Sequence, residues 1–269
     1  MTSELSSLCS YAKGKVSVDT LSKRNYVSTE NMMPNKGGIV DAGALPSAQY
    51  TQQYIKDDIL VSNIRPYFKK IWMADDDGGC SNDVLVFRAD RGCDSTFLYY
   101  ILANDAFFNY ASATSKGTKM PRGDKTAIMQ YKVPCFNYET QLRIGKLLRS
   151  IDDRIAVNKK INDNLQQQLF SLYENMATAS PCLKEYTLSN LCDFQEGYVN
   201  PPQTHPEYFD GEVKWLRAVD INESFIIETS RTLTKAGFES AKKSALLFEP
   251  NTIAISKSGT IGRLGIIAD

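Results

Sequence analysis

The sequence predicts an α+β protein in which two repeated domains of short strands and helices are joined by one long coiled-coil helix. Three observations support this fold. Residues 139–177 keep an unbroken heptad spacing, two stretches after that segment repeat stretches before it, and the strand and helix signals do not alternate regularly. We therefore divide the chain into a first domain at 1–136, a spacer helix at 137–180 and a second domain at 181–269.

The central helix is predicted from apolar or amide side chains that recur every three and four residues. Pro134 ends the preceding strand, Asn137 can cap the first turn, and Glu139 places a negative charge in that turn. At 1.5 Å per residue this helix is about 60 Å long, which exceeds the diameter of a small domain. The seam consists of Ile144, Leu148, Ile151, Ile155, Asn158, Asn162, Leu165, Leu169, Leu172 and Met176.

Two interpretations of this seam are open: a helix packed inside one domain, or a helix that pairs with another helix. Asn158 and Asn162 at its centre favour pairing, because a buried asparagine costs stability and fixes register or partner choice in coiled coils. We therefore expect a spacer with a specific helical partner.

An internal repeat predicts that the helix joins two copies of one fold. Residues 5–16 and 188–199 share Leu, Ser, Leu, Cys, an aromatic residue, Gly and Val at the same offsets. Residues 57–62 and 251–256 each form a turn signal followed by a short strand that ends in serine. Two matches in the same order indicate a duplicated domain. The first copy continues with a strand, a helix and a basic loop beyond the matching point, so we expect the second copy to be incomplete.

The first copy also carries its own strand and helix signals. Residues 83–88 predict a buried strand, residues 95–110 an aromatic-rich helix, and residues 129–133 a further strand. These short elements lack the regular alternation of a parallel sheet with crossover helices, which supports the α+β class.

The composition, with 42% hydrophobic and 23% charged residues, is that of a soluble globular protein. No apolar run approaches the roughly 20 residues of a membrane span. Residues 1–4 are polar and do not begin a signal peptide. We therefore expect a cytoplasmic protein.

The cysteines are scattered without a C-x-x-C pair, and His205 is the only histidine. This pattern argues against a zinc site and against catalysis by a Cys-His pair. We expect reduced and mostly buried thiols. The six cysteines are Cys9, Cys80, Cys93, Cys135, Cys182 and Cys192.

The formal net charge is zero, which argues against a strongly basic nucleic-acid binder but permits one whose charge is segregated. Residues 116–132 carry several basic side chains against the single acid Asp124. Such a run is either a solvated face or a surface that contacts phosphates, and the sequence leaves both open. The basic residues are Lys116, Lys119, Arg122, Lys125 and Lys132.

Two further motifs have features of functional sites. Residues 200–203 begin like the Asn-Pro-Pro-aromatic motif of amino-methyltransferases, but Gln203 replaces the aromatic residue, which favours a proline-rich loop. Residues 256–263 lack phosphate-loop spacing, yet a turn with basic and hydroxyl side chains around two glycines suits a DNA backbone as well as a solvated hairpin. The matching place in the first copy is 63–70. No triad, carboxylate dyad or metal cluster stands out, so we expect no enzyme and no catalytic residue.

A family resemblance adds to this interpretation. Residues 139–148, 151–155 and 158–161 resemble the spacer helix of Type I restriction-modification specificity subunits, and residues 253–263 are similar to the target-recognition domains of that family. The resemblance implies a non-catalytic subunit in which each domain recognises one half of a split DNA target. It also implies methyltransferase (M) subunits that hold S-adenosylmethionine and methylate adenine, and restriction (R) subunits that bind through M.

The sequence and the resemblance together predict two sets of binding residues, one for a helical partner and one for DNA. The seam is expected to pair antiparallel with the same helix of a second chain, with Asn158 and Asn162 near the crossing, which favours a palindromic split target. The predicted DNA-binding residues are Arg65, Lys69, Lys70, Lys116, Thr118, Lys119, Arg122, Lys125, Trp215, Arg217, Lys257, Ser258, Thr260 and Arg263.

The sequence is also consistent with a second function class. A coiled-coil scaffold or dimerisation protein, whose globular ends bind other proteins, accounts for the same helix. The two functions differ in the salt dependence of DNA binding, which is steep only where basic residues neutralise phosphates.

Overall fold

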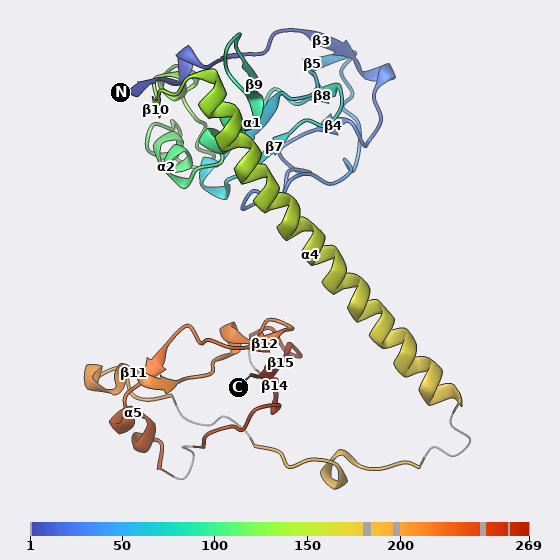
Figure 1. Ribbon diagram of the computed structural model, residues 1–269, viewed down its shortest axis with the longest axis vertical. Coiled ribbons are helices and arrows are strands. Elements are labelled where there is room, and N and C mark those ends of the chain that lie inside the picture. The colour runs from blue at the N-terminus through green and yellow to red at the C-terminus, as the bar shows by residue number, and fades with distance from the viewer. Residues whose placement is uncertain (1, 180–183, 196–199, 243–245, 258, 269) are drawn as a thin grey trace. The chain divides into compact units, whose positions relative to one another are not determined.

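The computed structural model describes every residue except 1, 180–183, 196–199, 243–245, 258 and 269 (Figure 1). Its contacts divide the chain into two compact units, Met1–Ala179 and Ser180–Asp269, and each is described by itself. Both units combine short strands with helices, and a long helix follows the first copy, so the predicted α+β fold class is confirmed. Among the described residues, no helix combines the length and apolar character that a membrane span requires.

The first unit is built on two four-stranded sheets. The central sheet has the order β2 (Cys9–Tyr11), β9 (Val84–Ala89), β6 (Ile59–Ser62) and β7 (Ile71–Met73), and all its strand pairs are antiparallel. The second sheet has the order β3 (Lys15–Ser17), β5 (Tyr50–Tyr54), β8 (Gly78–Cys80) and β4 (Tyr26–Val27), in which β4 is parallel to β8. A separate antiparallel pair joins β1 (Thr2–Glu4) to β10 (Lys132–Pro134).

The central sheet separates two hydrophobic clusters, because successive side chains along a strand point to opposite faces. Ile59 and Val61 of β6 pack with residues of three helices, α1 (Ser95–Leu102), α2 (Asp105–Ala113) and α3 (Lys125–Met129). Leu60 packs instead with residues of the second sheet. The central sheet is therefore covered by helices on one face and by strands on the other.

Two local predictions are wrong, and in both a side-chain cap is the reason. Residues 95–110 form two helices and not one, because the side chain of Asn104 accepts a hydrogen bond from the Ala106 N–H (2.8 Å) and starts α2. Residues 129–133 are not one strand, because Asp124 caps α3, which ends at Met129, and β10 begins only at Lys132.

The spacer helix α4 (Tyr138–Ala179) begins where the sequence predicts, since Asn137 accepts a hydrogen bond from the Thr140 N–H (2.9 Å). Its first turns pack on α1. The buried Gln141 accepts from the Asp94 N–H (3.0 Å) and donates to a backbone carbonyl. A methyl group on Gly145 would lie 2.8 Å from the Asp94 carboxylate, so this close approach needs glycine. Beyond this contact α4 extends away from the sheets of the first unit (Figure 1).

The described residues of the second unit form two small sheets and one α-helix. One sheet pairs β11 (Phe209–Lys214) with β13 (Thr232–Leu233), and the other has the order β12 (Phe225–Ile226), β15 (Leu264–Ile267) and β14 (Ile253–Ile255). The helix is α5 (Lys235–Ser240). The pair β14–β15 is an antiparallel hairpin, as is β6–β7 in the first unit.

The hydrogen bonds of the two units support the predicted duplication. Asp57 and Asn251 share a φ of 69°, and their N–H groups donate across the hairpin to Ala74 (2.9 Å) and Ile267 (2.8 Å) respectively. The first match likewise forms a 3-10 helix in each copy, Leu5–Ser7 and Leu188–Asn190. Residues 196–199 of that match lie outside the described residues.

A third match was not predicted from the sequence. The Ser28 N–H donates to the Asn31 side chain (2.6 Å), and the Arg217 N–H donates to the Asp220 side chain (2.9 Å). The next residue is buried in both copies, Met32 in one and Ile221 in the other. The two units therefore share three segments in the same chain order.

Candidate functional site

The turn that follows β6 carries three of the predicted DNA-binding residues. Arg65 and Lys69 flank a 3-10 helix, Pro66–Phe68, and both adopt left-handed backbone conformations with φ of 50° and 52°. Lys70 donates from Nζ to the Thr29 carbonyl (2.6 Å). The Arg65 Nε is buried without a hydrogen-bond partner among the described residues, and such a group can be satisfied by a ligand.

A second loop is joined to this turn by backbone hydrogen bonds. The N–H groups of Asn35 and Lys36 donate to the carbonyls of Phe68 and Lys69, at 2.8 Å each. One carboxylate of α2 binds both segments, because Asp105 lies 2.8 Å from the Lys36 Nζ and 3.0 Å from the Lys69 Nζ. These two ammonium groups lower the pKa of Asp105 from its usual value.

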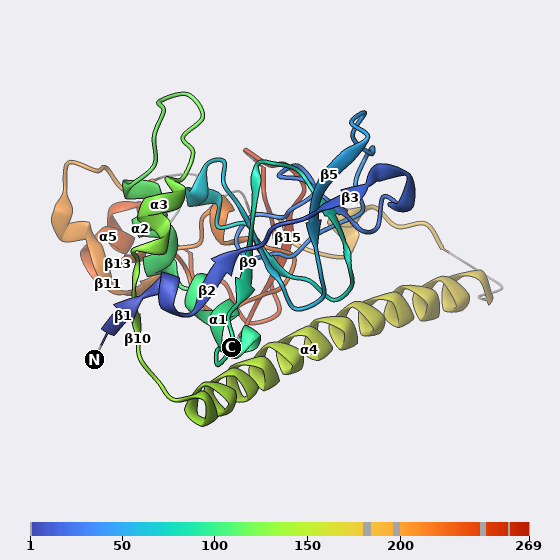
Figure 2. The ribbon, with the colours of Figure 1, turned by 90° about the horizontal axis from the view of Figure 1, so that it is seen from above.

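The basic loop before α3 is the third part of this arrangement. The Arg65 N–H donates to the Pro121 carbonyl (2.8 Å), while Lys116 and Arg122 exchange two backbone hydrogen bonds of 2.9 Å that close the loop. Figure 2 shows this loop projecting from the first unit between α2 and α3. We call the three connected segments, 33–37, 62–70 and 115–124, the loop platform.

The residues of the basic loop that are predicted to contact phosphates differ in whether they have an acidic partner. Lys116 pairs with Asp124 (2.6 Å) and lowers the pKa of that carboxyl, and Arg122 pairs with Asp83 (3.0 Å). These two cations already have acidic partners. In the part of the chain that the structure describes, Lys119 and Lys125 are exposed and form no ion pair, and the uncharged Thr118 is exposed as well.

Exposed apolar side chains on the loop platform were not predicted as functional. Tyr67 is 51% exposed and Phe68 is 39% exposed, and their ring centroids are 4.8 Å apart. Met33 and Met120 from the other two segments are also exposed. The sequence feature that could have identified these side chains is an aromatic pair inside a turn that also contains arginine and lysine. This combination is used in nucleic-acid binding.

In the second unit, a turn at the same place of the fold connects β14 to β15. The buried Ser256 closes it, because its Oγ accepts from the Arg263 N–H (2.9 Å) and donates to the Thr260 carbonyl. Gly259 and Gly262 have φ of 79° and 87°. Lys257 and Thr260 are exposed, whereas Ser258 lies outside the described residues.

Trp215 and Arg217 lie in a partly buried stack of rings and guanidinium groups. The Arg217 Cζ is 5.5 Å from the Trp215 ring centroid, and the Arg231 Cζ is 6.0 Å from that ring and 4.3 Å from the Phe209 ring. These contacts assign both residues a packing role, and their contact with DNA stays a prediction.

The seam of α4 has two different environments. Ile144 packs against the core of the first unit, and Leu148 is half-buried. Every side chain from Arg149 to Met176 is exposed. The exposed part of the seam consists of Ile151, Ile155, Asn158, Asn162, Leu165, Leu169, Leu172 and Met176.

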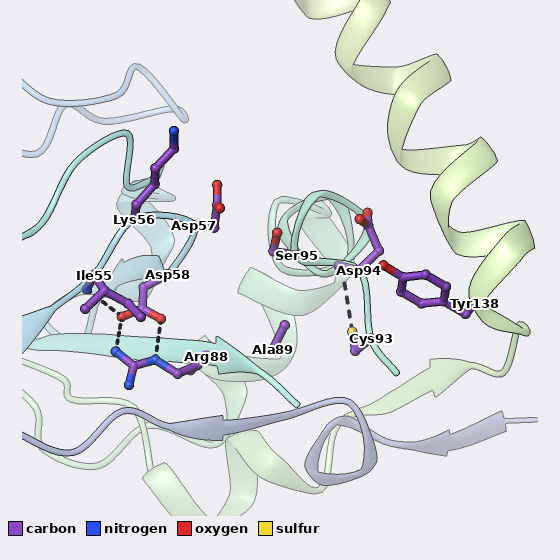
Figure 3. Close-up of a pocket in the computed structure, with 10 residues that line it drawn as sticks. All are labelled: Ile55, Lys56, Asp57, Asp58, Arg88, Ala89, Cys93, Asp94, Ser95 and Tyr138. Atoms are coloured by element: carbon purple, nitrogen blue, oxygen red, sulfur yellow. Dashed lines mark hydrogen bonds and ion pairs between the residues drawn. The ribbon is translucent and has the colours of Figure 1, made fainter. Parts of the chain in front are cut away.

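A hollow of about 350 Å³ lies beside the turn at residues 55–58, the end of β9 and the start of α1 (Figure 3). Within it the Arg88 guanidinium donates to both carboxylate oxygens of the buried Asp58 (2.8 and 2.6 Å), which raises the pKa of Arg88. Burial raises the pKa of Cys93 to about 12, so this thiol is protonated at neutral pH. The hollow therefore contains a charge-compensated ion pair and a protonated thiol.

The remaining cysteines and acids form no metal centre in the described part of the chain. No group of three or more His, Cys, Asp or Glu side chains is placed to hold a metal ion there. The described cysteines are free thiols, and burial raises the pKa of Cys80 to about 12. Cys182 lies outside the described residues.

The solved structures that are similar to this chain include the following three. The HsdS subunit of Thermoanaerobacter tengcongensis has 17% identity and a TM-score of 0.48, covering 99% of this chain and 71% of that one. The S subunit of the Type I system of M. genitalium has 17% identity and a TM-score of 0.47, covering 98% and 67%. A chain from a structure of Type I R-M complex assembly has 18% identity and a TM-score of 0.49, covering 100% and 71%.

The match to a family model is more direct. The model described as the Type I restriction modification DNA specificity domain matches residues 1–167, which is more than half of the chain. This family consists of non-catalytic subunits that recognise DNA. The chain belongs to the Type I restriction-modification DNA specificity family.

Proposed function

We propose that each unit of this specificity subunit contacts one half of a bipartite target in double-stranded DNA. The observation that carries this proposal is the turn shared by the two copies, after β6 and after β14. In both copies the turn combines basic side chains with an exposed apolar tip, Tyr67 in the first and Ile261 in the second. Basic groups suit the phosphates of DNA, and apolar groups suit the base edges and faces.

The methylation and restriction reactions are then carried out by other subunits of the complex. We propose that M subunits bind S-adenosylmethionine and methylate adenine at N6, and that R subunits join through M. The present chain directs them to the target in the cytoplasm, where the host DNA lies. Among the described residues, Lys119 and Lys125 of the basic loop are exposed and have no acidic partner, which supports phosphate binding by this chain.

The test is the salt dependence of duplex binding by the full chain with its M subunits. Changing Lys119 to Ala should weaken binding to all sequences alike and reduce the slope of log K against log salt by about one unit. Lys15→Ala, on a strand of the second sheet, is the control and should leave the slope unchanged. Binding that does not depend on salt would instead support the scaffold function.

We also propose that α4 pairs antiparallel with α4 of a second chain. A two-fold axis at residue 160 places Asn158 opposite Asn162, Ile155 opposite Leu165 and Ile151 opposite Leu169. Burying each apolar side chain is worth roughly 1.5–3 kcal/mol. Charge favours this direction, because residues 143–154 carry four basic and two acidic residues, whereas residues 163–176 carry two acidic residues and no basic one.

Light scattering on purified chains tests this pairing. The wild type should have the mass of a dimer at micromolar concentration, and Ile155→Asp should shift it to the monomer because a charge enters the apolar seam. Ala156→Asp places the same charge on the other side of the helix and should leave the dimer intact. A wild-type monomer would contradict the proposed pairing.

A further inference from the structure

The loop platform exposes a cluster of apolar side chains in an otherwise charged surrounding. Tyr67 and Phe68 stand at the turn after β6, and Met120 lies on the basic loop joined to it. Burying apolar surface lowers the free energy, so exposed aromatic groups on a binding surface are favoured contact points for a ligand. In the chain, Arg65 lies two residues before Tyr67, and Lys69 directly follows Phe68.

The backbone that carries this cluster is held in place from several sides. The Asn35 and Lys36 N–H groups bind the turn from one side, and the Pro121 carbonyl binds the Arg65 N–H from another. Asp105 pairs with Lys69 from α2. Left-handed conformations of non-glycine residues cost energy and persist only where the surroundings enforce them, and they occur often at functional sites. Tyr67 is therefore presented on a prearranged turn.

The second copy exposes an apolar side chain at the same place of the fold. Ile261 is 78% exposed, and it lies in the turn between β14 and β15. Lys257 precedes it and Arg263 follows it in that turn. Two copies of the fold thus place an apolar tip between basic residues, although the side chains differ in kind.

We propose that Tyr67 and Ile261 enter a groove of the DNA, contact bases there, and set the base preference of the half-site that each unit recognises. This inference rests on the proposed function and adds its specificity-determining residues. Apolar side chains distinguish base pairs through the thymine methyl group and by inserting between base steps. The surrounding cations contact phosphates, which fixes the position of the tip without reading sequence.

The experiment selects duplexes from a library with randomised positions, using the full chain assembled with its M subunits. Sequencing of the bound fraction then gives the base preference at each position. Tyr67→Ala should relax the preference in one half of the target, and Ile261→Ala should relax it in the other half. Each change should reduce affinity for the wild-type target by roughly 5- to 150-fold, the range for losing one ring or apolar contact with a base, while affinity for non-target duplexes stays within about twofold.

Two matched controls separate the tips from exposed residues in general. Tyr50→Ala removes an equally exposed tyrosine on β5, and Ile227→Ala removes an exposed isoleucine outside the turn. Neither should change the selected sequences. Tyr67→Phe should keep most of the preference, because the ring makes the contact.

The outcomes also distinguish this inference from the proposed function. If wild-type complexes select no sequence, the proposed function fails and the inference fails with it. If the wild type selects a target and both alanine variants select it equally well, only the inference is overturned. A loss of M subunits from the Tyr67→Ala complex, measured by its mass, would assign the platform to a protein partner and would also overturn the inference.

Discussion

The turns after β6 and after β14 occupy the same place in two copies of one fold, yet they are held in different ways. In the first copy, non-glycine residues adopt left-handed conformations, and hydrogen bonds from two other loops hold them there. In the second copy, glycines occupy the left-handed positions of the turn, and Ser256 closes it from within. Left-handed positions in a turn can therefore be supported by distant contacts or by local residue choice.

The two turns should therefore differ in which sequence changes they tolerate. A turn that depends on distant contacts is sensitive to changes elsewhere in its unit, such as at Asp105. A turn that depends on its own residues is sensitive mainly to changes within itself.

The largest difference is expected at the two serines. Ser256→Ala removes the acceptor of the Arg263 N–H and leaves that buried region with an unpaired donor, which costs about 1–3 kcal/mol in the stability of the second unit. Ser62→Ala removes a single bond to the Ile64 carbonyl (3.0 Å) and should cost the first unit about 0.5–1.5 kcal/mol. Amide hydrogen exchange of each hairpin measures both losses. Equal losses would show that Ser256 has no special role.

A smaller effect is expected from glycine replacement in the second turn. Gly262→Ala should destabilise the hairpin by about 1 kcal/mol, because a φ of 87° disfavours any residue with a Cβ. The added methyl group meets no atom within 4 Å, so the effect comes from the backbone alone. Gly43→Ala is the control, since it also meets no atom within 4 Å but has no positive φ, and its exchange should not change.

The smallest effect is expected at Asp105, which joins two exposed lysines. Asp105→Asn should raise the amide exchange of Asn35 and Lys36 about two- to fivefold relative to intrinsic rates, the range for loss of exposed ion pairs. Asp41→Asn, an exposed acid outside the ion pair, should not raise it.

The same pairing predicts a pH dependence with a definite sign. The pKa of Asp105 is lowered in the folded protein, so its contribution is complete above the usual carboxyl pKa of 3.8 and is lost as the pH falls through the lowered value. Protection of the Asn35 and Lys36 amides should therefore fall on acidification in the wild type. In the Asp105→Asn variant, protection of these two amides should be low at every pH. Protection that changes with pH equally in both proteins would show that the Asp105 carboxylate does not cause the pH dependence.

The α+β class, the cap of α4 at Asn137 and the duplication could be predicted from the sequence. Each of these rests on a local or periodic pattern. The heptad spacing repeats every seven residues, the cap lies within three residues of the group it binds, and the repeated turn at Asp57 and Asn251 keeps its residue types in order. Such patterns can be recognised without knowing which distant segments of the chain contact each other.

The sequence could not show which seam residues and which cations already have partners within the folded chain. Ile144 belongs to the heptad pattern but packs on its own unit, because Gln141 and Gly145 bring α4 against α1. Lys69 belongs to the basic turn but pairs with Asp105 of α2. These contacts join segments that are far apart in the chain. No spacing or periodicity in the sequence indicates such contacts, because they form only when the chain folds.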